Sequence, residues 1–358
     1  WIMTNATNSM DNRRAYRRLH YLRAFVISGV VLIIGLLLST TIGAVEGVDA
    51  KVFFLSLFQY DGSVEHLIMR TLRMPRAALG ALVGANLAIA GLLMQGISRN
   101  PLASPGIFGV NAGASLFVAL AFTSIYGAPM VSSIAIPFFG PLGIVPVAFL
   151  GAAFGGILVY FLGGVASGRV NPVRLVLAGV AVSTLLASLM KGTIILQDEN
   201  TDSLVYWLAG AVDGSDWNDV RTILPWTMVG LGITAYLAIS LNLLALGEDV
   251  AVGLGRNIHV IRAIGGLGII CVAGSAVAVA GPITFVGLIV PHICRRLIGV
   301  DHRVLLVLAP VLGAAMMVYS DILARFIAFP FESPVGIVTA LVGGPYFLYL
   351  TQRTRMDR

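Results

Sequence analysis

Side chains able to carry chemistry are few in this sequence, and they are widely separated. The five histidines are scattered along the chain: His20, His66, His259, His292 and His302. No GxxxxGK(S/T) phosphate-binding loop, no HExxH and no Ser/His/Asp arrangement of catalytic spacing occurs. Cys271 and Cys294 belong to no CxxC or Cys/His cluster, which indicates structural thiols. The sequence therefore predicts no catalytic residue, no metal site and no cofactor on this chain.

The most informative polar stretch, residues 95–106, stands between two apolar runs, 77–96 and 107–125. Its prolines, Pro101 and Pro105, lack an N–H and disfavour helix in the residue before them, which excludes one continuous helix. The stretch predicts a tight polar reversal between two membrane helices. Irregular backbone is tolerated at membrane depth only where protein buries it or water wets it. We therefore expect this turn to line a pathway.

The composition is that of a membrane-embedded chain. Of its 358 residues 58% are hydrophobic and 11% are charged, and the mean hydropathy is +0.92, whereas a soluble domain has about 25% charged residues. The formal charge of +6 comes from basic residues spread over short loops, which favours a cytoplasmic flank over nucleic-acid binding. The 41 glycines are typical of helices that pack closely in lipid.

Apolar runs predict an all-α polytopic protein with about ten transmembrane helices. The expected spans are 24–44, 77–97, 107–126, 144–165, 173–196, 223–245, 261–280, 283–298, 304–328 and 334–351. Around Gly281 and Pro282 a short helix pair and one broken helix are equally compatible with the pattern. The bias of Lys and Arg among the loops places both termini in the cytoplasm. Residues 1–23 and 353–358 then form cytoplasmic tails.

Four arginines depart from this bias and fall on the outer side. Arg70, Arg73 and Arg76 precede the second span, and Arg325 lies near the outer end of the ninth. One interpretation is that they reach lipid phosphates. The other is that they form a docking surface for an acidic partner, since guanidinium groups pair well with carboxylates. The residues alone leave both open.

On the inner side, residues 246–256 separate the sixth and seventh spans. Glu248 and Asp249 can start a short helix there, near its positive dipole end, and Gly255 can close it. Such a helix is either a contact site for a cytoplasmic partner or a simple connector between two spans. In the second span, Gly80, Gly84 and Ala88 at four-residue spacing indicate a helix-packing face.

Several segments, taken together, resemble the permeases of type II ABC importers for iron siderophores and vitamin B12. They are Arg73–Arg76, Gly91–Gln95, Arg99–Pro105 with Gly109 and Gly113, Leu204–Gly210, Leu246–Gly255, Gly281–His292, Asp301–Arg303 and Gly343–Pro345. The resemblance runs from about residue 24 to the C-terminus. Each motif is weak alone, and their order makes the match specific.

The resemblance implies a single permease domain, residues 24–352, of ten helices in two inverted five-helix halves. It also implies a second permease subunit, identical or related, two cytoplasmic ATPases that bind ATP and Mg²⁺, and an extracytoplasmic binding protein. The location implied is the bacterial cytoplasmic (inner) membrane, in contact with lipid. No ATP-hydrolysing site is expected on this chain.

The resemblance also assigns roles to residues. Arg73, Arg76 and Arg325 would pair with glutamates of the binding protein. Asn100 and Leu102 would help to form a cytoplasmic gate. The ATPase contact maps onto a helix near 247–255, with Gly247, Glu248, Asp249, Leu254 and Gly255.

Ferric siderophore is the expected substrate, with cobalamin or haem as alternatives. The main rival is an ion-coupled secondary carrier built from inverted repeats, which shares the hydropathy pattern. Such carriers usually place carboxylates inside the membrane, and here Asp321 alone lies within a predicted span. A second rival is a non-transporting membrane scaffold.

Overall fold

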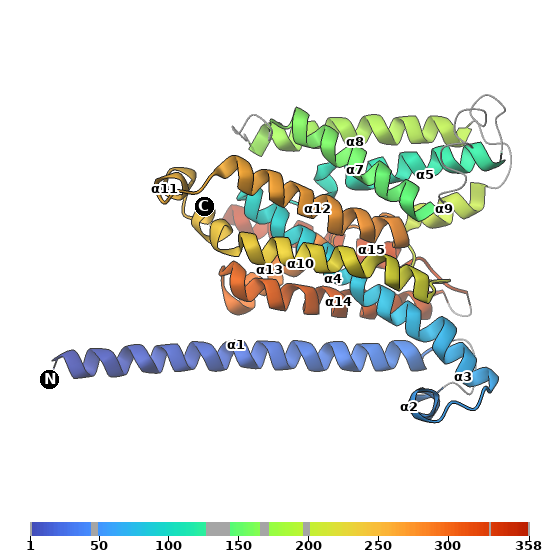
Figure 1. Cartoon of the computed structure of the whole chain (residues 1–358), viewed down its shortest axis with the longest axis horizontal. Helices are drawn as coiled ribbons and strands as arrows, with labels where there is room; N and C mark the ends of the chain where they lie inside the picture. The colour runs from blue at the N-terminus through green and yellow to red at the C-terminus, as the bar shows by residue number, and fades with distance from the viewer. Residues whose placement is uncertain are drawn as a thin grey trace.

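The computed structural model describes residues 2–43, 49–126, 144–164, 172–195, 201–328 and 331–356, and every regular element in these ranges is helical (Figure 1). The elements are α1 (Ile2–Thr41), α2 (Ala50–Phe58), α3 (Val64–Ile68), the π-helical turn η1 (Met69–Arg73), α4 (Met74–Ser98), the 3-10 helix η2 (Pro105–Phe108), α5 (Val110–Tyr126), α7 (Ile144–Leu162), α8 (Pro172–Ile195), α9 (Thr201–Ala209), α10 (Trp217–Ala245), α11 (Glu248–Gly253), α12 (Ile258–Ala280), α13 (Val286–Ile298), α14 (His302–Ile327) and α15 (Val335–Met356). Residues 357–358 of the expected C-terminal tail lie outside the described ranges. The expected N-terminal tail is continuous with the first span in α1.

Seven of the described helices are long and apolar enough to cross a membrane, and each overlaps a predicted span. The predicted all-α membrane class is therefore confirmed, whereas the count of ten is not. The remaining predicted spans correspond to α5, α13 and α15, whose apolar helical parts are shorter. The arrangement in two inverted halves stays a prediction.

The predicted span 283–298 is not a helix of full length, and here the expectation needs correction. Residues 281–285 are not helical, and α13 begins only at Val286. Its 13 residues give a length of about 20 Å at 1.5 Å per residue, against a hydrocarbon core of about 30 Å. The chain breaks because Gly281 takes a positive φ of 70° and Pro282 follows it. The structure thus contains a helix pair rather than one broken helix.

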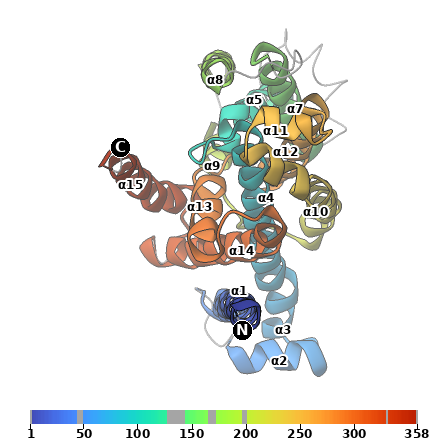
Figure 2. The ribbon, with the colours of Figure 1, turned by 90° about the vertical axis from the view of Figure 1, so that its left-hand side faces the viewer.

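Helix α4 is the central element of the bundle, and its small residues allow close approach of its neighbours. Figure 2 shows α4 among α10, α12, α13 and α14, with α8, α15 and α1 towards the periphery. A Cβ added to Gly84 would overlap the carbonyl oxygen of Gly313 in α14. A Cβ added to Gly91 would overlap the carbonyl oxygen of Gly287 in α13. The predicted packing face of α4 is confirmed at Gly84, while Gly80 has open space around it.

This difference makes a matched pair of alanine substitutions informative. Gly91→Ala forces a methyl group into the backbone of α13, and we expect a loss of about 1–3 kcal/mol in stability. Gly80→Ala meets no atom within 4 Å and should leave stability unchanged. The yield of monodisperse protein and its thermal unfolding in detergent measure both. Equal stability of the two variants would show that α4 and α13 are not packed backbone to backbone.

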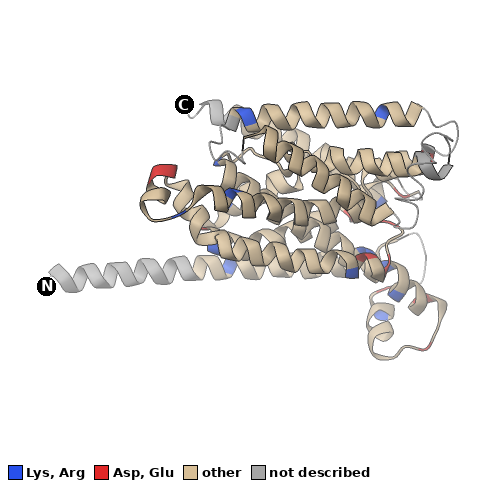
Figure 3. Ribbon diagram, turned by 45° about the horizontal axis from the view of Figure 1, so that its top comes forward, with Lys and Arg blue, Asp and Glu red and all other residues tan. Residues whose placement is uncertain are grey.

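Among the described residues, charged residues lie mostly towards the two ends of the helical body, and few lie in its middle (Figure 3). The N-terminus, the C-terminus and α11 lie at one end, called the α11 end below (Figure 1). Helices α2 and α3 lie at the opposite end, called the α2 end. This distribution is the one expected of a bundle whose middle sits in lipid.

Candidate transport pathway and docking sites

The polar turn between α4 and α5 is built as a compact, internally bonded unit. Helix α4 ends at Ser98, and Arg99 takes the left-handed conformation with φ 51°. The side-chain oxygen of Asn100 accepts a hydrogen bond from the backbone N–H of Leu102 at 2.9 Å. The backbone carbonyl of Asn100 accepts a hydrogen bond from the backbone N–H of Ala103 at 3.1 Å. The predicted break of helix at this stretch is confirmed. Asn100 and Leu102, the expected gate residues, are half-buried in the turn.

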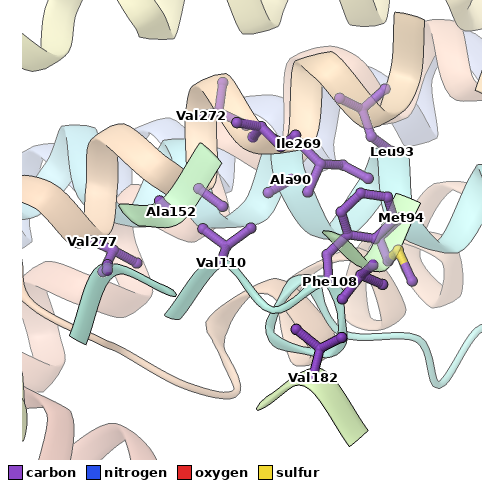
Figure 4. Packing of buried hydrophobic residues seen from close by; sticks show 14 of the residues in the cluster. Ala90, Leu93, Met94, Phe108, Val110, Ala152, Val182, Ile269, Val272 and Val277 are labelled. Carbon is purple, nitrogen blue, oxygen red and sulfur yellow. The ribbon is translucent and has the colours of Figure 1, made fainter. Parts of the chain in front are cut away.

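After this turn the chain enters the protein as η2. Pro105 and Phe108 are buried, and Figure 4 shows Phe108 close to Met94 of α4 within the apolar cluster that also includes Val182 of α8. A Cβ on Gly179 of α8 would overlap the carbonyl oxygen of Ile107. The irregular backbone is therefore enclosed by protein, which is the condition for its presence at membrane depth.

The start of α13 lies next to η2, which follows this turn. A Cβ added to Gly287 would lie 2.9 Å from Cγ of Pro105. Gln95, near the end of α4, donates its side-chain N–H to the carbonyl of Leu288 at 3.2 Å, and its side-chain oxygen accepts from Arg295. The start of α13 and the 3-10 helix η2, far apart in sequence, thus meet beside α4.

Helix α11 is the short helix predicted between α10 and α12, and it lies at the α11 end of the body. Gly247 and Gly255 flank it with φ values of 131° and 78°, which other residues rarely adopt. Ala251 is buried against the body, whereas Leu246, Val250, Val252 and Leu254 are exposed. The acidic residues Glu248 and Asp249 occupy its first turn. An exposed apolar surface beyond the membrane body is typical of a protein-docking site.

The arginines predicted to dock a partner lie together at the α2 end, and each is already bonded within the chain. Arg76 donates to Asp321, with 2.9 Å between Nη2 and Oδ1, and to Glu332 at 2.7 Å. Arg325 donates to the same Asp321 and to the carbonyls of Ser39 and Ile42 at 2.8 and 2.9 Å.

Arg73 and Arg70 complete this region in different ways. Arg73 is buried and donates to the carbonyls of Thr40 and Thr41 at 3.0 and 2.9 Å. Arg70 lies 4.3 Å above the ring of Tyr60 and donates to the carbonyl of Ser56 at 2.7 Å. All three predicted docking arginines therefore face the α1–α14 side of the α2 end, and Arg70 is held separately against α2.

Other residues with potential chemistry do not form a further centre in the described part of the chain. No three His, Cys, Asp or Glu side chains gather there as metal ligands. Cys271 and Cys294 are buried free thiols. His292 packs edge-on against the ring of Tyr346, which is a structural contact.

Helices long and apolar enough to span a membrane, a turn that leads into the buried 3-10 helix η2 and an exposed short helix at one end of the bundle are the features of a membrane permease. The FecCD transport family model matches residues 31–353. The chain therefore belongs to the FecCD transport family, the permease subunits of ABC importers for iron siderophores and vitamin B12.

Individual proteins show the same likeness. The Fe(3+)-citrate import system permease protein YfmD of Bacillus subtilis (strain 168) is 48% identical over 93% of this chain and 96% of its own length. The cobalamin import system permease protein BtuC of Halobacterium salinarum is 40% identical over 79% of this chain and 73% of its own. A solved metal-chelate type ABC transporter in an inward-facing conformation superimposes with a TM-score of 0.77 at 28% identity, over 92% of this chain and 99% of that one.

Proposed function

We propose that this chain is the permease subunit of an ATP-driven importer that moves a ferric chelate, a ferric siderophore or ferric citrate, across the cytoplasmic membrane. The observation that carries the substrate class is the 48% identity with an Fe(3+)-citrate permease over nearly the full length of both chains. Citrate and siderophores bind iron through similar oxygen donors, so one permease scaffold suits both. The chain itself is proposed to hold no cofactor, and ATP and Mg²⁺ to bind to partner ATPases.

Three other functions are weaker candidates. Cobalamin is supported by the halobacterial relative at 40% identity, and haem follows from the family alone. An ion-coupled carrier needs a carboxylate that can gain and lose a proton inside the membrane. Asp321 is a poor candidate for this role, because it is buried between the guanidinium groups of Arg76 and Arg325.

The proposed mechanism is alternating access between two permease subunits. Two ATPases bind the α11 end, and ATP binding brings them together. The exposed apolar side chains of α11 form a surface to which the ATPases can bind. The substrate is then released into the cytoplasm past the turn that contains Asn100 and Leu102. In this orientation the α11 end, with both termini, is cytoplasmic, and the α2 end faces the extracytoplasmic binding protein.

Docking of the binding protein is proposed to involve Arg73, Arg76 and Arg325. Glu332 is the accessible member of their ion pairs, since its side chain is 49% exposed while that of Asp321 is 4% exposed. An incoming glutamate can therefore replace Glu332 on Arg76 without disturbing Asp321. This exchange supports a docking role for arginines that are already paired within the chain.

Arg76→Gln tests docking at the predicted arginine whose ion pairs include an accessible carboxylate, that of Glu332. Asp321 keeps Arg325 as its partner in this variant. We expect the affinity for the binding protein to fall about thirtyfold or more, because loss of one member of a close interfacial ion pair typically costs about 2–5 kcal/mol. Arg70→Gln is the matched control and should bind normally. The affinity is measured by surface plasmon resonance with the permease in nanodiscs. An unchanged affinity of Arg76→Gln for the binding protein would show that Arg76 is not part of the docking surface.

The proposed substrate is tested by uptake in vesicles that contain the permease, its ATPase and its binding protein. Radioactive iron should accumulate when supplied as ferric citrate or as a ferric hydroxamate, and labelled cobalamin and haem should not. Accumulation of cobalamin without iron would assign the chain to vitamin B12 import instead.

A further inference from the structure

A single carboxylate oxygen joins α11 to two other elements at the α11 end. Oε1 of Glu248 accepts from Nη2 of Arg99 at 2.7 Å and from Nη2 of Arg262 at 2.8 Å. Arg99 begins the turn between α4 and α5, and Arg262 belongs to the start of α12. Glu248 is the first residue of α11. The helix proposed to meet the ATPase is thus bonded directly to the turn proposed to gate the pathway.

The two ion pairs differ in their exposure to water. The side chain of Arg262 is 2% exposed, so its pair with Glu248 is shielded from water and is costly to break. The side chain of Arg99 is 38% exposed, so water can replace Glu248 there at little cost. The pair with Arg262 therefore fixes Glu248 to α12, whereas the pair with Arg99 can form and break.

Arg99 is well placed to move the turn as one piece. Its left-handed backbone directs the chain from the end of α4 into the turn, and non-glycine residues rarely hold this conformation without support. The next residue, Asn100, binds the N–H groups of Leu102 and Ala103. A displacement of the Arg99 side chain is therefore transmitted to the bonded unit 99–103.

We propose that the Arg99–Glu248 ion pair is a releasable latch that couples movement of α11 to the turn at residues 99–103. Glu248 is the positioning residue, because it fixes Arg99 relative to α11 and α12. The inference rests on the proposed function, in which an ATPase grips α11. When α11 shifts, the latch carries the turn with it; when the latch is open, the turn is independent of the ATPase.

The test is the ratio of ATP hydrolysed to substrate transported by the complete complex. Arg99→Gln should leave ATP hydrolysis within about twofold of normal and lower substrate uptake about tenfold, so that the ratio rises about tenfold. Arg99→Lys keeps the charge and should restore most of the uptake. Arg296→Gln is the control: it removes an exposed arginine at the same end that makes no ion pair within the described residues.

A second variant separates coupling from folding. Glu248→Gln removes both pairs, so it should uncouple transport and also lower the melting temperature, because Arg262 loses its buried counter-charge. Arg99→Gln should uncouple without a change in melting temperature. A normal ratio of ATP to substrate in Arg99→Gln would overturn the latch. If the unsubstituted complex shows no ATP-dependent uptake, the proposed function fails, and the latch fails with it.

Discussion

Asp321→Asn is expected to lower the free energy of unfolding by about 3–5 kcal/mol, the range found when one member of a buried ion pair is removed. Asp321 is buried and accepts from both Arg76 and Arg325. Without its charge, two buried guanidinium groups repel each other at the junction of α4 and α14. Unfolding of the purified protein in mixed micelles with increasing sodium dodecyl sulfate measures this loss.

Glu332→Gln is the matched control, because it removes the other carboxylate on Arg76. Its side chain is 49% exposed, so the expected loss is at most about 1 kcal/mol. A large loss for Asp321→Asn with a small one for Glu332→Gln would show that the buried carboxylate organises the α2 end. Equal losses would contradict this view.

A triple variant in which Val250, Val252 and Leu254 are replaced by aspartate should fail to assemble with the ATPase. These side chains are between 45% and 60% exposed, so the isolated permease loses little contact within its own fold. At an interface each aspartate would have to give up water, and the few residues that dominate an interface contribute about 2 kcal/mol or more each. We expect co-purification of the ATPase to fall by more than tenfold.

Val300→Asp serves as the control for added charge, since Val300 is 69% exposed between α13 and α14. This variant should retain the ATPase. The melting temperature of the triple variant without the ATPase should match that of the unsubstituted subunit. A triple variant that still retains the ATPase would move the contact away from α11.

The turn at 95–106 could be predicted from sequence because its cause is local. Pro101 and Pro105 exclude a continuous helix whatever surrounds them. The same holds for α11, where Gly247 and Gly255 allow backbone angles that end a helix. The meeting of η2 with the start of α13 could not be predicted, because Pro105 and Gly287 are brought together only by packing around α4.

Ion pairing was the part of the site that sequence reasoning missed. Asp321 and Arg325 stand four residues apart on one helix, a spacing that signals a pair. Arg76 joins them from a distance of 245 residues, and Glu248 lies 149 residues from Arg99. Charged residues at the same end of a helical bundle have many possible partners, and only the tertiary structure selects among them.

The most direct measurement is substrate uptake by proteoliposomes in which this subunit is present with or without its ATPase and binding protein. We predict accumulation of the ferric chelate only when both partners and hydrolysable ATP are present, and none when a proton gradient is imposed in their absence. Accumulation driven by the gradient through this subunit alone would contradict the proposal that its movement is supplied by other proteins.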